Sequence, residues 1–188
     1  MINLLNVCSY IGRGKNLPAE FKYKDKTTHI LKYSDIDEDG FFDTSKELTL
    51  RVDDEKLFKD LIYSEQNDII FPELYRNNLI LKLIQEDSQN TMAYSNSVFV
   101  IKVNTQLYNP NFLFHLLSSE KYKRKLEEEV YKSSKGYQGV FQMRLESLRK
   151  FEIPFIPLEE QKKILEQDLK INNKIDELKK QIHMLYDL

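Results

Sequence analysis

The sequence predicts an α+β protein, in which a mixed, β-rich globular domain (residues 1–156) precedes a long C-terminal α-helix (residues 157–188) that forms a coiled coil. Short apolar segments separated by turn residues dominate the chain up to Val103 and indicate strands. The first clear helix signal is Asn109-Pro110, because asparagine caps helices and proline fits their first turn. Beyond residue 157 the chain carries a heptad repeat with charged flanks, which is typical of a coiled coil.

The composition is that of an ordinary soluble protein with one medium-sized domain and an appendage. The chain has 188 residues, of which 41% are hydrophobic. No apolar run approaches the roughly 20 residues of a membrane span, and the N-terminus lacks the basic start and long apolar stretch of a signal peptide. We therefore expect a cytoplasmic location. The single cysteine, Cys8, excludes an internal disulfide and a cysteine-based zinc site.

The predicted strands of the first hundred residues are short and apolar. They cover residues 4–10, 28–33, 68–72, 79–84 and 97–103, of which 79–84 is the expected return strand of a hairpin. Two connections between them are distinctive. A basic loop punctuated by Gly12 and Gly14 covers residues 11–18, and an acidic turn covers residues 34–40.

Helical spacing appears after Pro110. Phe112, Leu113, Leu116 and Leu117 form one apolar face, and a second helix is expected over about residues 119–131. A helical turn at 145–149 and a strand at 151–155 then lead to the long helix.

The long helix carries an apolar stripe at positions three and four residues apart, interrupted only by Asp168. Such a stripe must be buried against a second copy of the chain, a helix of another protein, or the body of its own domain. We expect a dimer interface, formed by Ile164, Ile171, Ile175, Leu178, Ile182 and Leu185.

Charge is unevenly distributed along a chain whose net charge is only −2. Residues 20–60 carry a net charge of −4, whereas residues 121–150 have nine Lys/Arg against four Glu. Two polar loops are expected, at residues 73–78 and 133–144, and the second lies in the basic segment. Both contain Arg, Asn or Gln, the side chains that contact base edges in DNA, although any surface loop can contain them.

Catalytic and metal-binding patterns are missing from the sequence. The three histidines have no ligand spacing, no Ser/His/Asp arrangement is suggested, and five glycines leave little material for a nucleotide-binding loop. We therefore expect a non-catalytic protein that needs no cofactor or metal ion.

Several segments, in their order along the chain, resemble the specificity subunits of type I restriction–modification systems. The most specific stretch is Ile153-Pro154-Phe155-Ile156-Pro157-Leu158-Glu159-Glu160-Gln161-Lys162-Lys163-Ile164, which joins the predicted domain to the long helix. The weaker ones are Gly12-Arg13-Gly14, Ile30-Leu31-Lys32-Tyr33-Ser34-Asp35-Ile36 with Gly40, Asn67-Asp68-Ile69-Ile70-Phe71, Pro110-Asn111-Phe112-Leu113 through Ser119, and Gly136 with Gln138.

This resemblance implies a target recognition domain that binds part of a split DNA site, followed by a helix that acts as a spacer. Full-length members carry two such domain–helix pairs, and this sequence carries one. It therefore resembles a half-subunit, or a truncated remnant, that would recruit methyltransferase (M) and restriction (R) subunits. The alternatives are an interaction module that uses the terminal helix without recognising DNA, and an enzyme acting alone, which the missing motifs disfavour.

Specific DNA recognition needs cations for phosphates and polar side chains for base edges. The candidate phosphate contacts are Arg13, Lys15, Lys132, Lys135 and Arg144. The candidate base contacts are Tyr75, Arg76, Asn77, Tyr137, Gln138 and Gln142. For each of them the simpler alternative is a solvated surface side chain.

Overall fold

The central sheet of the computed structural model has four strands in the order β2 (Cys8–Arg13), β9 (Val98–Val103), β5 (Ile69–Pro72) and β7 (Lys82–Leu83), each antiparallel to its neighbours. The structure describes residues 1–16, 28–42, 49–50, 60–75, 79–87, 92–130 and 141–186. The predicted strands at 68–72 and 97–103 are confirmed as β5 and β9, the middle strands of this sheet. The predicted hairpin is confirmed by the pairing of β5 with β7.

Apolar residues on both faces of this sheet are buried, which explains why β5 is apolar throughout. Ile69 and Phe71 belong to the larger core, which packs under the helices, whereas Ile70 belongs to the core on the opposite face. The alternation follows from the two-residue period of a strand.

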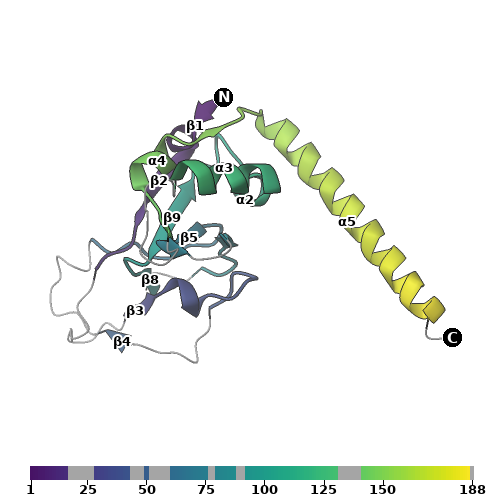
Figure 1. Ribbon diagram of the computed structural model, residues 1–188, viewed down its shortest axis with the longest axis horizontal. Helices are drawn as coiled ribbons and strands as arrows, with labels where there is room; N and C mark the ends of the chain where they lie inside the picture. Colours follow the sequence, from purple (N-terminus) through teal and green to yellow (C-terminus); the bar gives the residue numbers. More distant parts are fainter. Residues whose placement is uncertain are drawn as a thin grey trace.

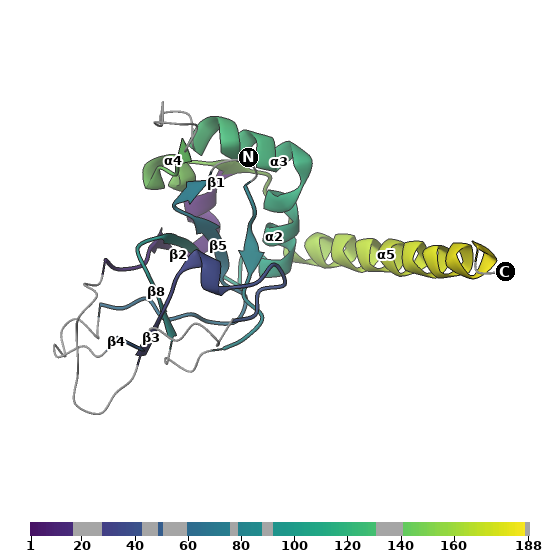
Figure 2. The ribbon, with the colours of Figure 1, turned by 60° about the horizontal axis from the view of Figure 1, so that its bottom comes forward.

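Helices cover one face of the central sheet (Figures 1 and 2): α2 (Pro110–Ser118), α3 (Glu120–Val130) and α4 (Leu145–Arg149). A smaller sheet lies on the other side, with β3 (Thr28–Leu31) between β4 (Thr49–Leu50) and β8 (Met92–Tyr94). The predicted cap of α2 is confirmed, because the Asn109 side chain accepts a hydrogen bond from the Phe112 N–H at 3.1 Å.

The expected basic loop at residues 11–18 is wrong in its first part, because β2 continues to Arg13 and pairs with β9. The glycines are needed for close packing. A Cβ at Gly12 would overlap the Tyr10 ring, and a Cβ at Gly14 would overlap the carbonyl oxygens of Tyr94 and Ser95. The strand expected at residues 4–10 also begins late, because Leu4–Val7 forms a 3-10 helix, η1.

A second 3-10 helix, η2 (Tyr33–Asp35), follows β3 and ends the strand expected at 28–33 two residues early. The acidic turn expected at residues 34–40 begins within η2. The antiparallel bridge between Ile36 and Phe42 then closes this turn and confirms that the chain reverses here. Among the side chains that the structure describes, no group of three or more His, Cys, Asp or Glu is arranged to hold a metal ion.

Among the residues that the structure describes, Asp68 carries a buried carboxylate. Asp68 accepts hydrogen bonds from the Tyr94 hydroxyl at 2.9 Å and from the Glu65 N–H at 2.9 Å, and its ion pair with Lys102 measures 3.0 Å. Burial raises the pKa of Asp68 to about 6, although Lys102 opposes the shift. This network ties β9 to the turn before β5.

The chain leaves the globular part through a two-stranded pair, β1 (Ile2–Asn3) with β11 (Glu152–Ile153), and then forms α5 (Leu158–Tyr186). Figure 1 shows α5 projecting from the globular part beside the N-terminus. Its first turn is anchored by the buried Gln161, whose side chain accepts from the Asn109 N–H at 2.7 Å and donates to the Ile156 carbonyl at 2.6 Å. None of the helices within the described ranges combines the length and apolar composition that crossing a membrane requires.

Candidate nucleic-acid interface

A short antiparallel ribbon brings the two predicted polar loops together. In this ribbon β6 (Leu74–Tyr75) pairs with β10 (Phe141–Gln142), with Tyr75 opposite Phe141 and Leu74 opposite Gln142. Backbone hydrogen bonds hold its base, because Glu73 N–H donates to Ser97 at 2.8 Å and Met143 N–H donates to Glu73 at 3.0 Å. Segments that are distant in sequence therefore form one surface.

Glu73 links two of the predicted DNA contacts. Its Oε1 atom lies 2.7 Å from Nη1 of Arg13 and accepts a hydrogen bond from Nε2 of Gln142 at 3.3 Å. The Arg13 side chain is 49% exposed and the Glu73 side chain only 17%. Arg13 comes from β2 and Gln142 from β10, so this carboxylate joins three segments at one point of the surface.

Sequence reasoning missed Glu73. Its acidic charge argues against a phosphate contact, and the expected loop at 73–78 included it only as a boundary. Its position directly after the buried strand β5 was the available signal, because polar residues at strand ends are held by the sheet in fixed directions.

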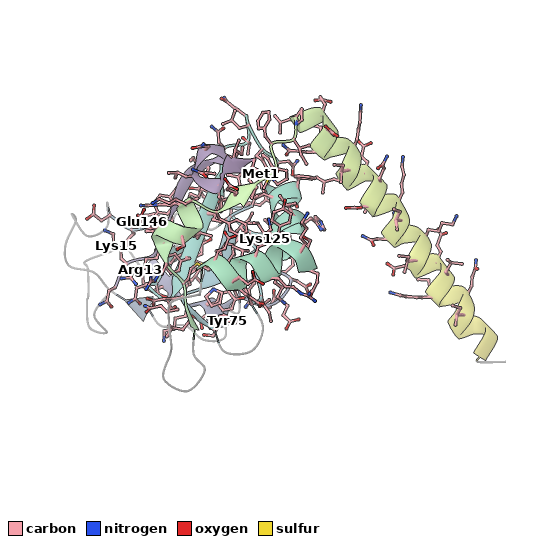
Figure 3. The ribbon with its side chains drawn as sticks, turned by 45° about the horizontal axis from the view of Figure 1, so that its top comes forward. Met1, Arg13, Lys15, Tyr75, Lys125 and Glu146 are labelled. Carbon is pink, nitrogen blue, oxygen red and sulfur yellow. The ribbon has the colours of Figure 1, made fainter. Side chains whose placement is uncertain are left out.

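Lys15 and Arg144, two predicted phosphate contacts, are both exposed. The Lys15 Nζ atom lies 3.8 Å from the Asp60 carboxylate, and both side chains are exposed, so the pair contributes little to stability. Arg144 occupies the N-cap position of α4, two residues beyond Gln142. In Figure 3, Arg13 and Lys15 lie close together, and Met1 marks the other end of the globular part.

Tyr75 has a packing role in addition to any DNA contact. Its side chain is half-buried against the larger core, and its pKa is raised by burial and by the nearby Glu127 carboxylate. Figure 3 shows Tyr75 on the side of the globular part away from Met1.

Six of the predicted contacts lie outside the described residues: Arg76, Asn77, Lys132, Lys135, Tyr137 and Gln138. Their segments adjoin Tyr75 and Phe141 in the chain, and these two residues are paired in the ribbon.

The predicted dimer interface on α5 has a half-buried part and an exposed part. Ile164 is half-buried against the protein's own core, beside Leu165. Ile171, Ile175, Leu178 and Ile182 are 42–57% exposed, and the side chain of Leu185 lies outside the described part. The domain body therefore covers only the start of the stripe.

Comparisons with known proteins support the resemblance. The family model for the type I restriction modification DNA specificity domain matches residues 2–183. No match was found among curated proteins.

Solved structures of S subunits are among those similar to the chain. The crystal structure of the HsdS subunit from Thermoanaerobacter tengcongensis aligns over 95% of the chain, with a TM-score of 0.60 and 18% identity, and the chain spans 43% of its length. The crystal structure of the type I restriction-modification system S subunit from M. genitalium aligns over 81% of the chain, with a TM-score of 0.46 and 13% identity, and the chain spans 33% of its length.

The first of these similarities supports the α+β fold with a C-terminal helix. The family model covers nearly the whole chain and confirms the resemblance noted in the sequence. The chain belongs to the family of type I restriction–modification DNA specificity domains.

Proposed function

We propose that the chain is a non-catalytic DNA specificity component of a type I restriction–modification system. Residues 1–156 would recognise one half of a bipartite DNA site, and residues 157–188 would form the spacer and dimer helix. The single observation that carries this proposal is the ribbon surface, where Arg13 and Gln142 converge on Glu73.

The chemistry of this surface suits DNA. A two-stranded β-ribbon fits the major groove, and Gln side chains form paired hydrogen bonds with adenine. Arg13 contacts Glu73 beside the ribbon, Arg144 follows Gln142 by two residues, and Lys15 lies near Arg13; all three are exposed cations that suit phosphates. The segment 121–150, which includes β10, carries nine Lys/Arg against four Glu and is therefore basic.

Two copies would pair through the exposed stripe of α5. The helix has 29 residues and is therefore about 43 Å long. A two-fold dimer presents two identical recognition surfaces, so the DNA site would be an inverted repeat whose spacer depends on helix length. Asp168 lies in this stripe and is exposed, so it would restrict the register of the pairing.

The modifying chemistry would belong to partner subunits. The family membership supports recruitment of a methyltransferase subunit and, with it, a restriction subunit. The assembly would then methylate or cleave DNA at positions that this chain selects.

Selection from a pool of random duplex DNA tests the proposal. The full chain is used alone and together with a methyltransferase subunit from the same host, because the proposed assembly contains that subunit. We expect a split sequence to be enriched at about 150 mM salt, and Arg13→Ala to weaken its binding and lower the salt slope by about one. Weak binding that is indifferent to sequence at every salt concentration, even with the methyltransferase present, contradicts the proposal.

An interaction module without DNA recognition is the second candidate. The exposed stripe of α5 and the weak net charge of −2 favour it. The same selection separates the two, because an interaction module enriches no sequence while its helix still pairs.

A further inference from the structure

Arg13 differs from the exposed cation next to it, because a carboxylate holds its side chain in one direction. Nη1 of Arg13 donates to Oε1 of Glu73 at 2.7 Å, and the Arg13 side chain is 49% exposed. The Lys15 Nζ atom, by contrast, lies 3.8 Å from the exposed Asp60 carboxylate. Arg13 is therefore a solvent-facing cation in a defined position, whereas Lys15 is only loosely paired.

The central sheet fixes the backbone on both sides of the Arg13–Glu73 pair. Arg13 in β2 and Phe71 in β5 are both register partners of Phe99 in β9. Glu73 follows Phe71 by two residues, and its N–H donates to the Ser97 carbonyl at 2.8 Å, directly before β9 begins. These main-chain hydrogen bonds hold both partners in place before a ligand binds, which lowers the entropy that binding costs.

The contact with Glu73 uses one side of the guanidinium and leaves another side open. A guanidinium is planar and has five N–H donors in a rigid arrangement. Nη1 lies on the side away from Nε, so Nε and Nη2 together form the opposite edge, with two parallel N–H bonds. Among the residues that the structure describes, Glu73 is the one acceptor for the Arg13 guanidinium, and this edge is therefore available to a ligand.

Two parallel donors fit a ligand that has two neighbouring acceptors. In the major groove guanine presents such a pair, N7 and O6, whereas adenine, cytosine and thymine do not. A phosphate also has two acceptor oxygens. However, the Glu73 carboxylate beside the guanidinium repels a negatively charged ligand and does not repel the uncharged edge of a base. The arrangement therefore favours guanine.

We infer that Arg13 recognises a guanine in the major groove through Nε and Nη2, and that Glu73 is the positioning residue that orients it. This inference rests on the proposed function, since it requires that this surface enters DNA. It assigns to Arg13 a base in place of the phosphate that its charge alone suggested, and it requires a G·C pair in the recognised half-site.

The test uses the duplex enriched by the selection described above, in which 7-deazaguanine replaces one guanine at a time. This probe lacks the N7 acceptor and leaves the charge of the DNA unchanged. We expect one guanine at which the probe weakens binding of the wild type about tenfold. Arg13→Ala should bind the two duplexes equally at this position. An arginine that only contacts a phosphate would leave the probe effect unchanged when it is removed.

Glu73→Gln tests the positioning role separately. The amide keeps the size of the side chain and an acceptor oxygen, but it loses the charge that strengthens the hydrogen bond to Arg13. Because a charge-assisted hydrogen bond is roughly twice as strong as a neutral one, we expect the probe effect to fall to about threefold. Binding to random duplex should become stronger, because a negative charge is removed from the surface. A purely structural role for Glu73 would not change the two measurements in opposite directions.

Lys15→Ala and Asp60→Asn are the matched controls, since they alter the neighbouring pair of a cation and a carboxylate. Lys15→Ala should weaken binding to every duplex, and both variants should keep the full probe effect. Thermal melting verifies that all four variants fold.

The outcomes separate the two proposals. If a sequence is enriched but no guanine loses its probe effect in Arg13→Ala, the inference is overturned and the proposed function stands. An undiminished probe effect in Glu73→Gln overturns the positioning role. If no sequence is enriched with the methyltransferase present, the proposed function fails and the inference fails with it.

Discussion

The globular part and α5 use the same apolar residue types in opposite ways. In the globular part, β5 is buried along its whole length between two cores. In α5, the stripe from Ile171 to Ile182 is about half exposed, and only the first two turns contact the domain. The stability of the first region is therefore internal, whereas the stripe of the second is largely uncovered, and we propose that another helix packs against it.

The largest expected effect concerns that stripe. Changing both Ile175 and Leu178 to Glu would bury like charges in the dimer interface, at a cost of at least about 5 kcal/mol, or over a thousandfold in dissociation constant. Sedimentation velocity should show a dimer for the wild type and a monomer for the double variant. The globular part should remain folded.

Leu169→Glu is the matched control for this prediction. Leu169 is 62% exposed and, at about 100° per residue, lies on the far side of α5 from Ile171. This variant should remain dimeric. A wild type that is monomeric at tens of micromolar, or a double variant that remains dimeric, would show that the stripe is not the interface.

A substitution in the core should destabilise the globular part, which the double substitution in α5 leaves folded. Phe71→Ala in β5 removes a fully buried ring and should lower the free energy of unfolding by about 3–5 kcal/mol in urea titrations. Phe41→Ala, at an exposed position, should cost less than about 1 kcal/mol. Equal costs at the two positions would argue against the core described above.

The stability of the globular part should also depend on pH, through Asp68. Its pKa is higher in the folded than in the unfolded chain, so the folded state holds this proton more tightly. The resulting stabilisation is complete below about pH 4 and is lost as the pH rises through about 6.

Asp68→Asn removes this contribution. The unfolding free energy of the wild type, measured relative to that of the variant in urea, should therefore fall by about 2–3 kcal/mol between pH 4 and pH 7. A difference that is constant or rises over this range would contradict the raised pKa.

The junction between the two regions provides a smaller effect. Gln161→Ala leaves the Asn109 N–H without the side-chain oxygen that now accepts its hydrogen bond, which should cost about 2 kcal/mol. Hydrogen exchange should also become faster in the first turn of α5. Gln167→Ala, at an exposed position of the same helix, should change stability by less than about 0.5 kcal/mol.

Local sequence patterns predicted the helices and strands that depend on interactions between nearby residues. The apolar run at residues 68–72 became β5, Asn109 caps α2, and the heptad region forms α5. In each case the deciding interaction lies within a few residues, as hydrophobic periodicity or a cap.

Contacts between residues that are far apart in the sequence determine the features that local patterns did not predict. Gly14 suggested a loop, but it is required because the carbonyl groups of Tyr94 and Ser95 approach β2 closely. The pairing of Leu74 with Gln142 joins a segment between β5 and β7 to one that follows α3, and no local pattern predicts such a register. The same holds for Glu73, whose partners come from two other strands.

Two copies of one recognition surface, held apart by paired helices, should read a DNA site with two separated halves. Sequencing of methylated bases in the genome of a host that carries this chain together with its methyltransferase tests this arrangement. We expect a split motif whose two halves are inverted repeats and whose methylation disappears in the Ile175→Glu, Leu178→Glu variant. A contiguous or asymmetric motif, or methylation that does not depend on this chain, would contradict it.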